Sequence, residues 1–532
     1  MPSLRHPSHP VIWLLPLAFL VCSWFAAAGF PYFLDNNESF LSYVHARNLE
    51  IWTPGEYGWL TAEATDPLRP DTEDVYTHNP NGPRYLHYLL LKLGIRELPQ
   101  HVLILGLLGT ALTAWLLTRV FHQPGLWVVS LAVVLDYVGF LAWTVNTYRV
   151  WTFVLYFGLV LAVMRRRPVW VGVLSFLLFQ VEYGMALFIG VTVAVLAFLV
   201  HGRRGWWLIG AARIGASVSL AVFAVQVLMY FGLSGLLDDL YTTYLRRGTD
   251  GEALGPLTFA YHSWHGLYEL AVSIGRDTYT RPVLVITVTG LGLAILILRR
   301  PNSTSAERFL AALMLSTLIG TLAVSTVLYG YFIGGFVQSL LPLSVFLVAP
   351  ATGLVALELK NVLARRWSSP YLGAVCGGLA LVPMVWSSLI HYEPPVAVPL
   401  FQMLQTDLRR QPVVAPFLGP ALAGPELAFS LTGGRAAATS DIDVTTSDLR
   451  RLADFKNVDG SLTYICLDTL YLRQRHKDGA FSVCELAASR MARRGDETVA
   501  SGLGWSVMRV RGQEPATALT VTDPDTGREE LP

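Results

Sequence analysis

One polar loop decides how this chain is interpreted: it begins with GFPYFLDNNESFLSYVHARNL (residues 29–49) and ends with YTHNPNGPRYLHYLLLKLG (residues 76–94). The first segment leaves an apolar run directly, and the second leads directly into another. Between the two runs lie polar side chains that a hydrocarbon-facing chain normally excludes, namely Asp35, Glu38, His78, Arg84 and His87. We therefore predict that the loop 31–100 carries the chemistry and that the rest of the chain holds it in place.

Composition defines the class of protein. Of the 532 residues, 53% are hydrophobic and 14% charged, and the mean hydropathy is +0.46. In soluble domains about 25% of residues are charged, so the sequence indicates an integral membrane protein. A net charge of +1 argues against a nucleic-acid partner, which would require a concentrated basic face. The four cysteines do not have the spacing of a zinc site.

Apolar runs predict eleven membrane spans. They lie near 11–30, 101–121, 125–145, 147–164, 207–231, 281–298, 309–328, 336–357 and 370–390, with two more inside 169–200. The run 169–200 is too long for one span, and Glu182-Tyr183-Gly184 interrupts it, so we expect two short helices that meet at a polar break. The first run ends in AAAG, so a cleaved signal peptide is the alternative to an uncleaved first helix.

Basic residues predict the orientation of these spans, because Lys and Arg collect on the cytoplasmic side. The connections that carry Arg119, 165–167, 203–204, 299–300 and 360–366 all fall on the side of the N terminus. The outer side then receives the loops 31–100 and 232–280 and the chain after 391. Loop 31–100 has ten acidic and five basic residues, which agrees with this side. The predicted orientation has the N terminus cytoplasmic and the C-terminal domain extracytoplasmic; the family resemblance given below implies a bacterial inner membrane as the location.

The predicted fold is therefore a mainly α membrane protein with a small extracytoplasmic α/β domain. Residues 1–392 form the transmembrane domain, 393–512 the α/β domain and 513–532 a disordered tail. In the outer loop, a helix over 38–50 and a second from Arg84 to Leu93 flank the turn 79–83. In the C-terminal domain SLTYICLDTL and WSVMRVRG are typical of strands and ELAASRMARRG of a helix. A disulfide between Cys466 and Cys484 is expected if this domain is exported.

The loop resembles that of the GT-C glycosyltransferases, above all the bacterial protein O-mannosyltransferase-like and aminoarabinose transferase-like members. In that family an acidic pair follows the first span, and a His/Lys-Pro-Pro-x-x-Tyr-type segment comes later. The matching residues here are Asp35 with Glu38, and His78-Asn79-Pro80 with Tyr85. Asn36 and Asn37 separate the acidic pair, and Asn81 replaces the second proline. The resemblance implies transfer of a sugar from a polyprenyl-phosphate donor, with the site on the extracytoplasmic side.

Inverting transfer from a lipid phosphate needs one carboxylate to accept the proton of the acceptor and cationic groups to stabilise the leaving phosphate. Asp35 is the candidate base; its alternative is a helix cap, because Asp35 and Glu38 also resemble a capping box. Glu38 is the second catalytic candidate. It would orient the acceptor or a divalent metal, or else only place a favourable charge at a helix N terminus. No cofactor is predicted beyond that metal.

The phosphate-binding candidates are Arg84, Arg246, Arg247 and His78. Arginine matches phosphate oxygens with a planar fork, although arginines at this level also contact lipid headgroups. Tyr85, His87 and Glu182 are candidates for the substrate cavity, with a structural hydrogen bond across the broken helix as the alternative for Glu182.

The predicted partners are the lipid-linked donor, membrane lipids and an acceptor that is a protein, a glycan or a lipid. The alternative function is a non-enzymatic carrier or flippase of lipid-linked saccharides, or a degenerate homologue that binds the lipid without transfer. A transporter typically has paired internal repeats, and we find none in this sequence.

Overall fold

A computed structural model describes much of the chain. The described residues are 37–51, 59–62, 75–76, 81–123, 125–136, 147–181, 183–244, 256–272, 274–275, 280–327, 337–369, 371–391, 398–416, 435–439, 444–468, 482–502 and 504–511. They belong to two compact units. One comprises Met1–Pro31, His45–Ala62 and Val75–Pro394, and the other comprises Tyr32–Val44, Glu63–Asp74 and Pro395–Pro532. The division at Pro394 lies beside the predicted boundary at 392.

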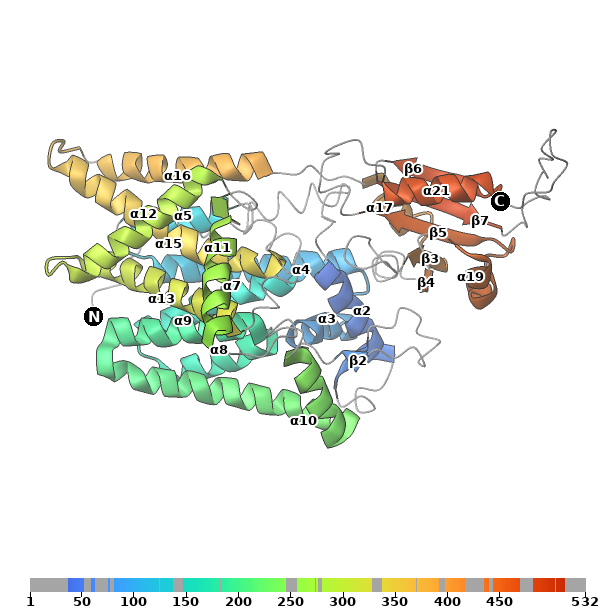
Figure 1. Ribbon diagram of the computed structural model, residues 1–532, viewed down its shortest axis with the longest axis horizontal. Helices are drawn as coiled ribbons and strands as arrows, with labels where there is room; N and C mark the ends of the chain where they lie inside the picture. The colour runs from blue at the N-terminus through green and yellow to red at the C-terminus, as the bar shows by residue number, and fades with distance from the viewer. Residues whose placement is uncertain are drawn as a thin grey trace. The chain divides into compact units, whose positions relative to one another are not determined.

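The first unit is a helical bundle (Figure 1). Its long helices are α4 (Leu98–Val120), α7 (Thr147–Met164), α8 (Pro168–Val181), α9 (Tyr183–His201), α10 (Trp206–Tyr244), α12 (Arg281–Arg299), α13 (Ser305–Val327), α15 (Val337–Ala364) and α16 (Leu372–His391). Shorter helices are α2 (Asn37–Ile51), α3 (Gly82–Lys92), α5 (Trp127–Leu135), the 3₁₀ turn η1 (Gly202–Gly205) and α11 (Pro256–Val272). Helix α2 is divided between the units: residues 45–51 belong to the first and 37–44 to the second. The two-residue strands β1 (Thr61–Ala62) and β2 (Val75–Tyr76) pair antiparallel.

The described residues contain six helical stretches long and apolar enough to cross a membrane, fewer than the eleven predicted. They are Gln100–Val120, Ala186–Asp238, Arg281–Arg299, Ser305–Val327, Phe346–Ala364 and Leu372–Ile390. The predicted span 11–30 and part of 125–145 lie outside the described residues. Two other predicted spans correspond to the shorter apolar helices Val150–Met164 and Pro168–Val181, and the stretch Ala186–Asp238 covers two predicted spans in one. The protein is nevertheless membrane-embedded by the length and composition of these six stretches.

The predicted break in the run 169–200 is present, because α8 ends at Val181 and α9 begins at Tyr183. The bundle is packed closely at small residues, as is usual for helices in membranes. A Cβ on Gly215 of α10 would lie 2.0 Å from the carbonyl oxygen of Gly172 in α8. A Cβ on Gly290 of α12 would lie 2.7 Å from the Cα of Ala351 in α15. These positions bring helix backbones together, and larger side chains would separate them.

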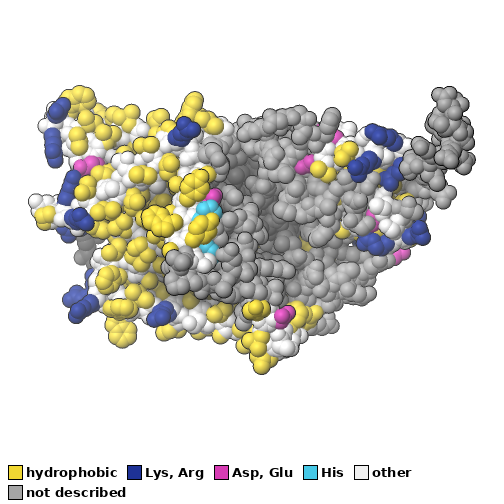
Figure 2. Space-filling view, viewed as in Figure 1, with side chains coloured by type: hydrophobic (Ala, Val, Ile, Leu, Met, Phe, Trp, Pro, Cys, Tyr) yellow, Lys and Arg dark blue, Asp and Glu magenta, His cyan; other side chains and the backbone are white. Residues whose placement is uncertain are grey.

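Three helix connections gather at one end of the bundle, the left end in Figure 1: α9 to α10, α12 to α13 and α15 to α16. Arg166 belongs there as well, because its Nε donates to Nδ1 of His201 at 3.2 Å, just before η1. Most of the Lys and Arg side chains visible on this unit lie at that end, and hydrophobic side chains cover much of the remaining face (Figure 2). Four of the five basic connections that were predicted to share one side, all except the one at Arg119, therefore lie at one end of the bundle.

The second unit is a five-stranded mixed sheet with helices (Figure 1). Its elements are α17 (Val398–Gln405), β3 (Val413–Pro416), β4 (Ala436–Thr439), α19 (Thr446–Arg451), the 3₁₀ turn η5 (Ala453–Phe455), β5 (Leu462–Leu467), α21 (Val483–Arg493), β6 (Glu497–Gly502) and β7 (Trp505–Val510). The strand order is β4-β3-β5-β7-β6; β3 pairs parallel with β4 and β5, and β7 pairs antiparallel with β5 and β6. The predicted disulfide joins Cys466 of β5 to Cys484 of α21.

Candidate functional site

Several predicted site residues lie outside the described part of the chain. They are Asp35, His78, Glu182, Arg246 and Arg247. Glu38 falls in the first turn of α2, where the structure describes the backbone. The roles assigned to these six residues stay predictions. The structure does bring Arg84, Tyr85 and His87 together on α3, the helix that follows the predicted turn.

The start of α3 is fixed by a close backbone contact. Pro83 stands in the first turn of the helix, where its missing N–H is tolerated. A Cβ on Gly82 would lie 2.4 Å from the carbonyl oxygen of Gln180 in α8, so only glycine lets α3 approach so closely. Gln180 in turn donates from Nε2 to the Ser219 hydroxyl of α10 at 2.8 Å. The predicted turn and the predicted helix break therefore meet at one place.

Arg84 is buried at this place, with 4% of its surface exposed. Its guanidinium donates to Oδ1 of Asn81, the residue that precedes α3. His45 of α2 is fully buried, and burial lowers its pKa well below 6.5. The positive charge of the nearby Arg84 lowers the pKa of His45 further. His45 is therefore neutral at pH 7 and able to donate one hydrogen bond and accept another.

A second set of hydrogen bonds holds the loop against the bundle through Tyr85. Its hydroxyl donates to the carbonyl oxygen of Trp59 at 2.7 Å and accepts from Nε2 of Gln226 in α10 at 3.0 Å. Burial raises the pKa of Tyr85, so this hydroxyl keeps its proton. The same Trp59 carbonyl accepts from Nδ2 of Asn81 at 3.4 Å. The backbone of Trp59 has φ 65°, an uncommon value for a non-glycine residue.

Apolar packing reinforces this attachment. Leu60, next to Trp59, is buried against Phe223 and Val227 of α10. The pairing of Thr61 with Tyr76 closes the loop just beyond this contact. The base of the loop is thereby positioned beside Arg84 by both hydrogen bonds and hydrophobic contacts.

His87 faces the interior of the unit and forms a pair with His101 of α4. Their rings stack at 5.2 Å between centroids, and their Nδ1 atoms lie 3.0 Å apart. Nε2 of His101 lies 2.9 Å from the carbonyl oxygen of Ile95 and must donate to it. In a neutral ring this leaves Nδ1 of His101 as an acceptor, so His87 donates. Burial, followed by the influence of His101, lowers the pKa of His87 to about 3. The pair is a neutral bridge between α3 and α4.

An ion pair fixes α2 on the other side of the site. Glu50 accepts from Arg47 at 3.2 Å within α2 and also from Arg96, just before α4 begins. The site is thus a buried arginine with amide, phenol and imidazole groups around it, on elements that several contacts lock together. Such an arrangement can hold an anionic oxygen by charge-assisted hydrogen bonds. Among the described residues no group of three His, Cys, Asp or Glu side chains could hold a metal ion.

Sequence reasoning missed His45, Trp59, His101 and Gln226 as parts of this site. Two of them carried a usable signal. His101 and Gln226 each stand in an otherwise apolar segment, where a polar side chain usually faces protein rather than lipid. His45 and Trp59 had no such signal, because each lies in a mixed stretch. Compared with models of known protein families and with curated proteins, the chain matches none of them.

Proposed function

We propose that the protein is a membrane glycosyltransferase that moves a sugar from a polyprenyl-phosphate donor to an acceptor on the extracytoplasmic side, with inversion. One observation supports this function most directly: Arg84 is buried beside Asn81 and His45, where the predicted catalytic loop returns to the bundle. A buried guanidinium favours an anionic ligand, and a lipid phosphate would bring one to this depth of the membrane.

In the proposed reaction, Asp35 accepts the proton of the acceptor hydroxyl. The hydroxyl oxygen then forms a bond to the anomeric carbon while the bond from that carbon to the phosphate oxygen breaks. Arg84 stabilises the charge that develops on the departing polyprenyl phosphate, and neutral His45 offers it a hydrogen bond. Tyr85 and Gln226 position the loop, while Glu38 orients the acceptor. His78, Arg246, Arg247 and Glu182 stay candidates for the donor site.

Two further features support an extracytoplasmic site. The disulfide Cys466–Cys484 in the second unit is suited to an oxidising compartment. Arginines at the α9–α10 and α12–α13 connections gather at one end of the bundle, which the positive-inside rule assigns to the cytoplasm. We infer a bacterial cytoplasmic membrane as the location, with the predicted donor and acceptor classes as partners.

The test is transfer of radiolabelled sugar from a panel of polyprenyl-phosphate donors by membranes that contain equal amounts of each variant. We expect Asp35→Asn to lose about 10²–10⁴ of the rate, as for a missing general base, and Arg84→Gln about 10²–10³, as for a missing charge-stabilising donor. Arg84→Lys should recover part of the loss. Arg281→Gln is the matched control, because it removes an exposed arginine of the same unit, at the start of α12.

The outcome also separates this function from the alternatives. Equal rates of sugar transfer by wild type and Asp35→Asn would show that Asp35 is a helix cap and not the base. No transfer from any donor, together with tight binding of polyprenyl phosphate, would favour the carrier or the degenerate homologue. Loss of thermal stability in Arg84→Gln but not in Arg84→Lys would attribute the effect of the first variant to folding.

A further inference from the structure

Helix α11 lies across its neighbours rather than alongside them (Figure 1). One of its faces is attached to the end of α13. A Cβ on Gly266 would lie 2.4 Å from the Cβ of Ser325, and the hydroxyls of Ser263 and Thr326 are 2.7 Å apart. His262 and Leu270 are buried on this side. This close contact between small residues determines which face of α11 is exposed.

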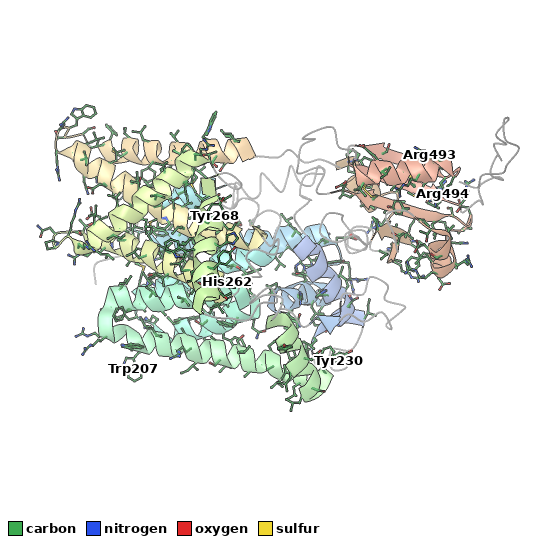
Figure 3. The ribbon with its side chains drawn as sticks, in the orientation of Figure 1. Trp207, Tyr230, His262, Tyr268, Arg493 and Arg494 are labelled. Atoms are coloured by element: carbon green, nitrogen blue, oxygen red, sulfur yellow. A yellow bond between two sulfur atoms is a disulfide. The ribbon has the colours of Figure 1, made fainter. Side chains whose placement is uncertain are left out.

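The outer face of α11 is aromatic. Tyr261, Trp264 and Tyr268 expose 58%, 74% and 62% of their surfaces. The His265 ring stacks on both tyrosines, at 5.4 Å and 10° from Tyr261 and at 6.2 Å and 14° from Tyr268. Its Nε2 lies 3.5 Å from Glu269. Figure 3 labels Tyr268 of the outer face and His262 of the attached face. The outer face thus combines broad apolar rings with hydroxyl and imidazole groups.

The place of α11 along the bundle agrees with a membrane surface. Helix α13 has 23 residues and begins just after the basic connection that carries Arg299 and Arg300. From Ser305 to Ser325, where it meets α11, it covers about 30 Å at ~1.5 Å per residue, and the hydrocarbon core of a bilayer is also about 30 Å thick. The aromatic face therefore lies about one membrane thickness from the basic end.

The end of α10 also exposes large apolar and aromatic side chains. Helix α10 kinks at Gly232, where φ is 71°. Beyond the kink, Leu233, Leu237 and Tyr241 recur at i, i+4 and i+8 and are all exposed. Two separate helical segments of one connection between spans thus present large apolar or aromatic side chains outward.

We propose that α11 is an interfacial helix and that its aromatic face lies in the headgroup layer of a phospholipid bilayer. Trp and Tyr favour this layer because an apolar ring body and a polar tip are satisfied there together. Helix α12, a candidate span, also has exposed apolar side chains at Val285 and Val288. This role does not depend on sugar transfer; it would hold for a carrier as well.

The test uses spin labels on single cysteines in the full chain, with Cys22 and Cys376 replaced by Ala, reconstituted in phosphatidylcholine vesicles. Label positions are Trp264→Cys on α11, Val288→Cys on the candidate span α12 and Val458→Cys on the surface of the second unit. All three side chains are exposed, so none of the substitutions removes core packing. Collision of each label with dissolved oxygen reports lipid, and collision with a water-soluble nickel chelate reports water.

We expect an intermediate depth at 264: several-fold less contact with the nickel chelate than at 458, and clearly more than at 288. Equal access at 264 and 458 would place the aromatic face in water and overturn the proposal in favour of a soluble partner. Equal protection at 264 and 288 would place α11 within the hydrocarbon and overturn it too. Wild-type thermal unfolding of each labelled protein confirms that the comparison is between folded chains.

Discussion

Helices α3 and α11 are attached to the bundle in the same way but differ in the side chains that they bury and expose. Each rests a glycine on the end of a neighbouring helix, Gly82 on Gln180 and Gly266 on Ser325. The difference is what each buries: α3 buries Arg84 and His87, whereas the outer face of α11 is left exposed.

The difference shows that composition alone does not decide the role of a helix beside a membrane. Both sequences mix His, Tyr and apolar residues, as GPRYLHYLLLK and PLTFAYHSWHGLYELAV show. In α3 the polar side chains contact partners from α2, α4 and α10. The buried guanidinium of Arg84 can therefore bind an anion. In α11 the rings of Trp264 and Tyr268 stay largely exposed, and we propose lipid headgroups as their surroundings.

The largest expected effect is on stability and on the binding of polyprenyl phosphate, and the binding distinguishes a substitution at Gly82 from one at Gly266. In Gly82→Ala the new methyl group would meet a backbone carbonyl that cannot move aside, so α3 must shift. We expect a loss of about 1–3 kcal/mol, as for other overpacked sites, together with loss of polyprenyl-phosphate binding because Arg84 moves with the helix. Gly266→Ala should cost a similar amount of stability and leave lipid-phosphate binding intact. Thermal unfolding in detergent and binding of polyprenyl phosphate measure the two effects.

Gly292→Ala is the control for both variants, because nothing lies within 4 Å of a Cβ at this position of α12. It should be neutral or slightly stabilising, since alanine favours helix. If Gly266→Ala abolished phosphate binding as fully as Gly82→Ala, the two helices would not be functionally distinct.

A smaller effect concerns pH. The pKa of His87 is about 3 in the folded protein and near 6.5 in the unfolded chain. Below pH 6.5 the unfolded chain takes up a proton that the folded protein does not, so stability falls as the pH falls from about 6.5 toward 3. One such group contributes up to ~1.4 kcal/mol per pH unit. In His87→Gln the midpoint of thermal unfolding should fall less steeply between pH 7 and pH 5.

His265→Gln on α11 is the matched variant for this measurement, because that ring is partly exposed. It should keep the wild-type pH dependence. An unchanged slope in His87→Gln would show that the buried pair with His101 does not set the acid sensitivity of the bundle.

Much of the fold follows from patterns that the sequence displays openly. The interruption Glu182-Tyr183-Gly184 predicted the division into α8 and α9, and Pro80 to Pro83 predicted the start of α3. The strand-like segment SLTYICLDTL predicted β5. Among the described residues six stretches are long and apolar enough to span, against eleven predicted in the whole chain. One reason is that an apolar run does not reveal where its helix ends, and α8 has only 14 residues.

The site was predictable only in part, since its partners come from distant segments. Arg84 and Tyr85 belong to a conspicuous turn and were identified. His45, Trp59 and Gln226 reach them from α2, the loop and α10, and no local spacing connects these residues. The kink at Gly232 was equally hidden, because a glycine in an apolar run is usually tolerated within a helix.

The smallest predicted effect tests how the loop is held. Tyr85→Phe removes the donor to the Trp59 carbonyl and the acceptor for Gln226, which should cost about 0.5–1.5 kcal/mol. Tyr268→Phe on α11 keeps the exposed ring and should change stability by less than about 0.5 kcal/mol. Both are read from thermal unfolding in the same detergent. If the two variants were equally stable, the hydrogen bonds of Tyr85 would add nothing to the attachment. Packing of Leu60 on Phe223 and Val227 would then hold the loop.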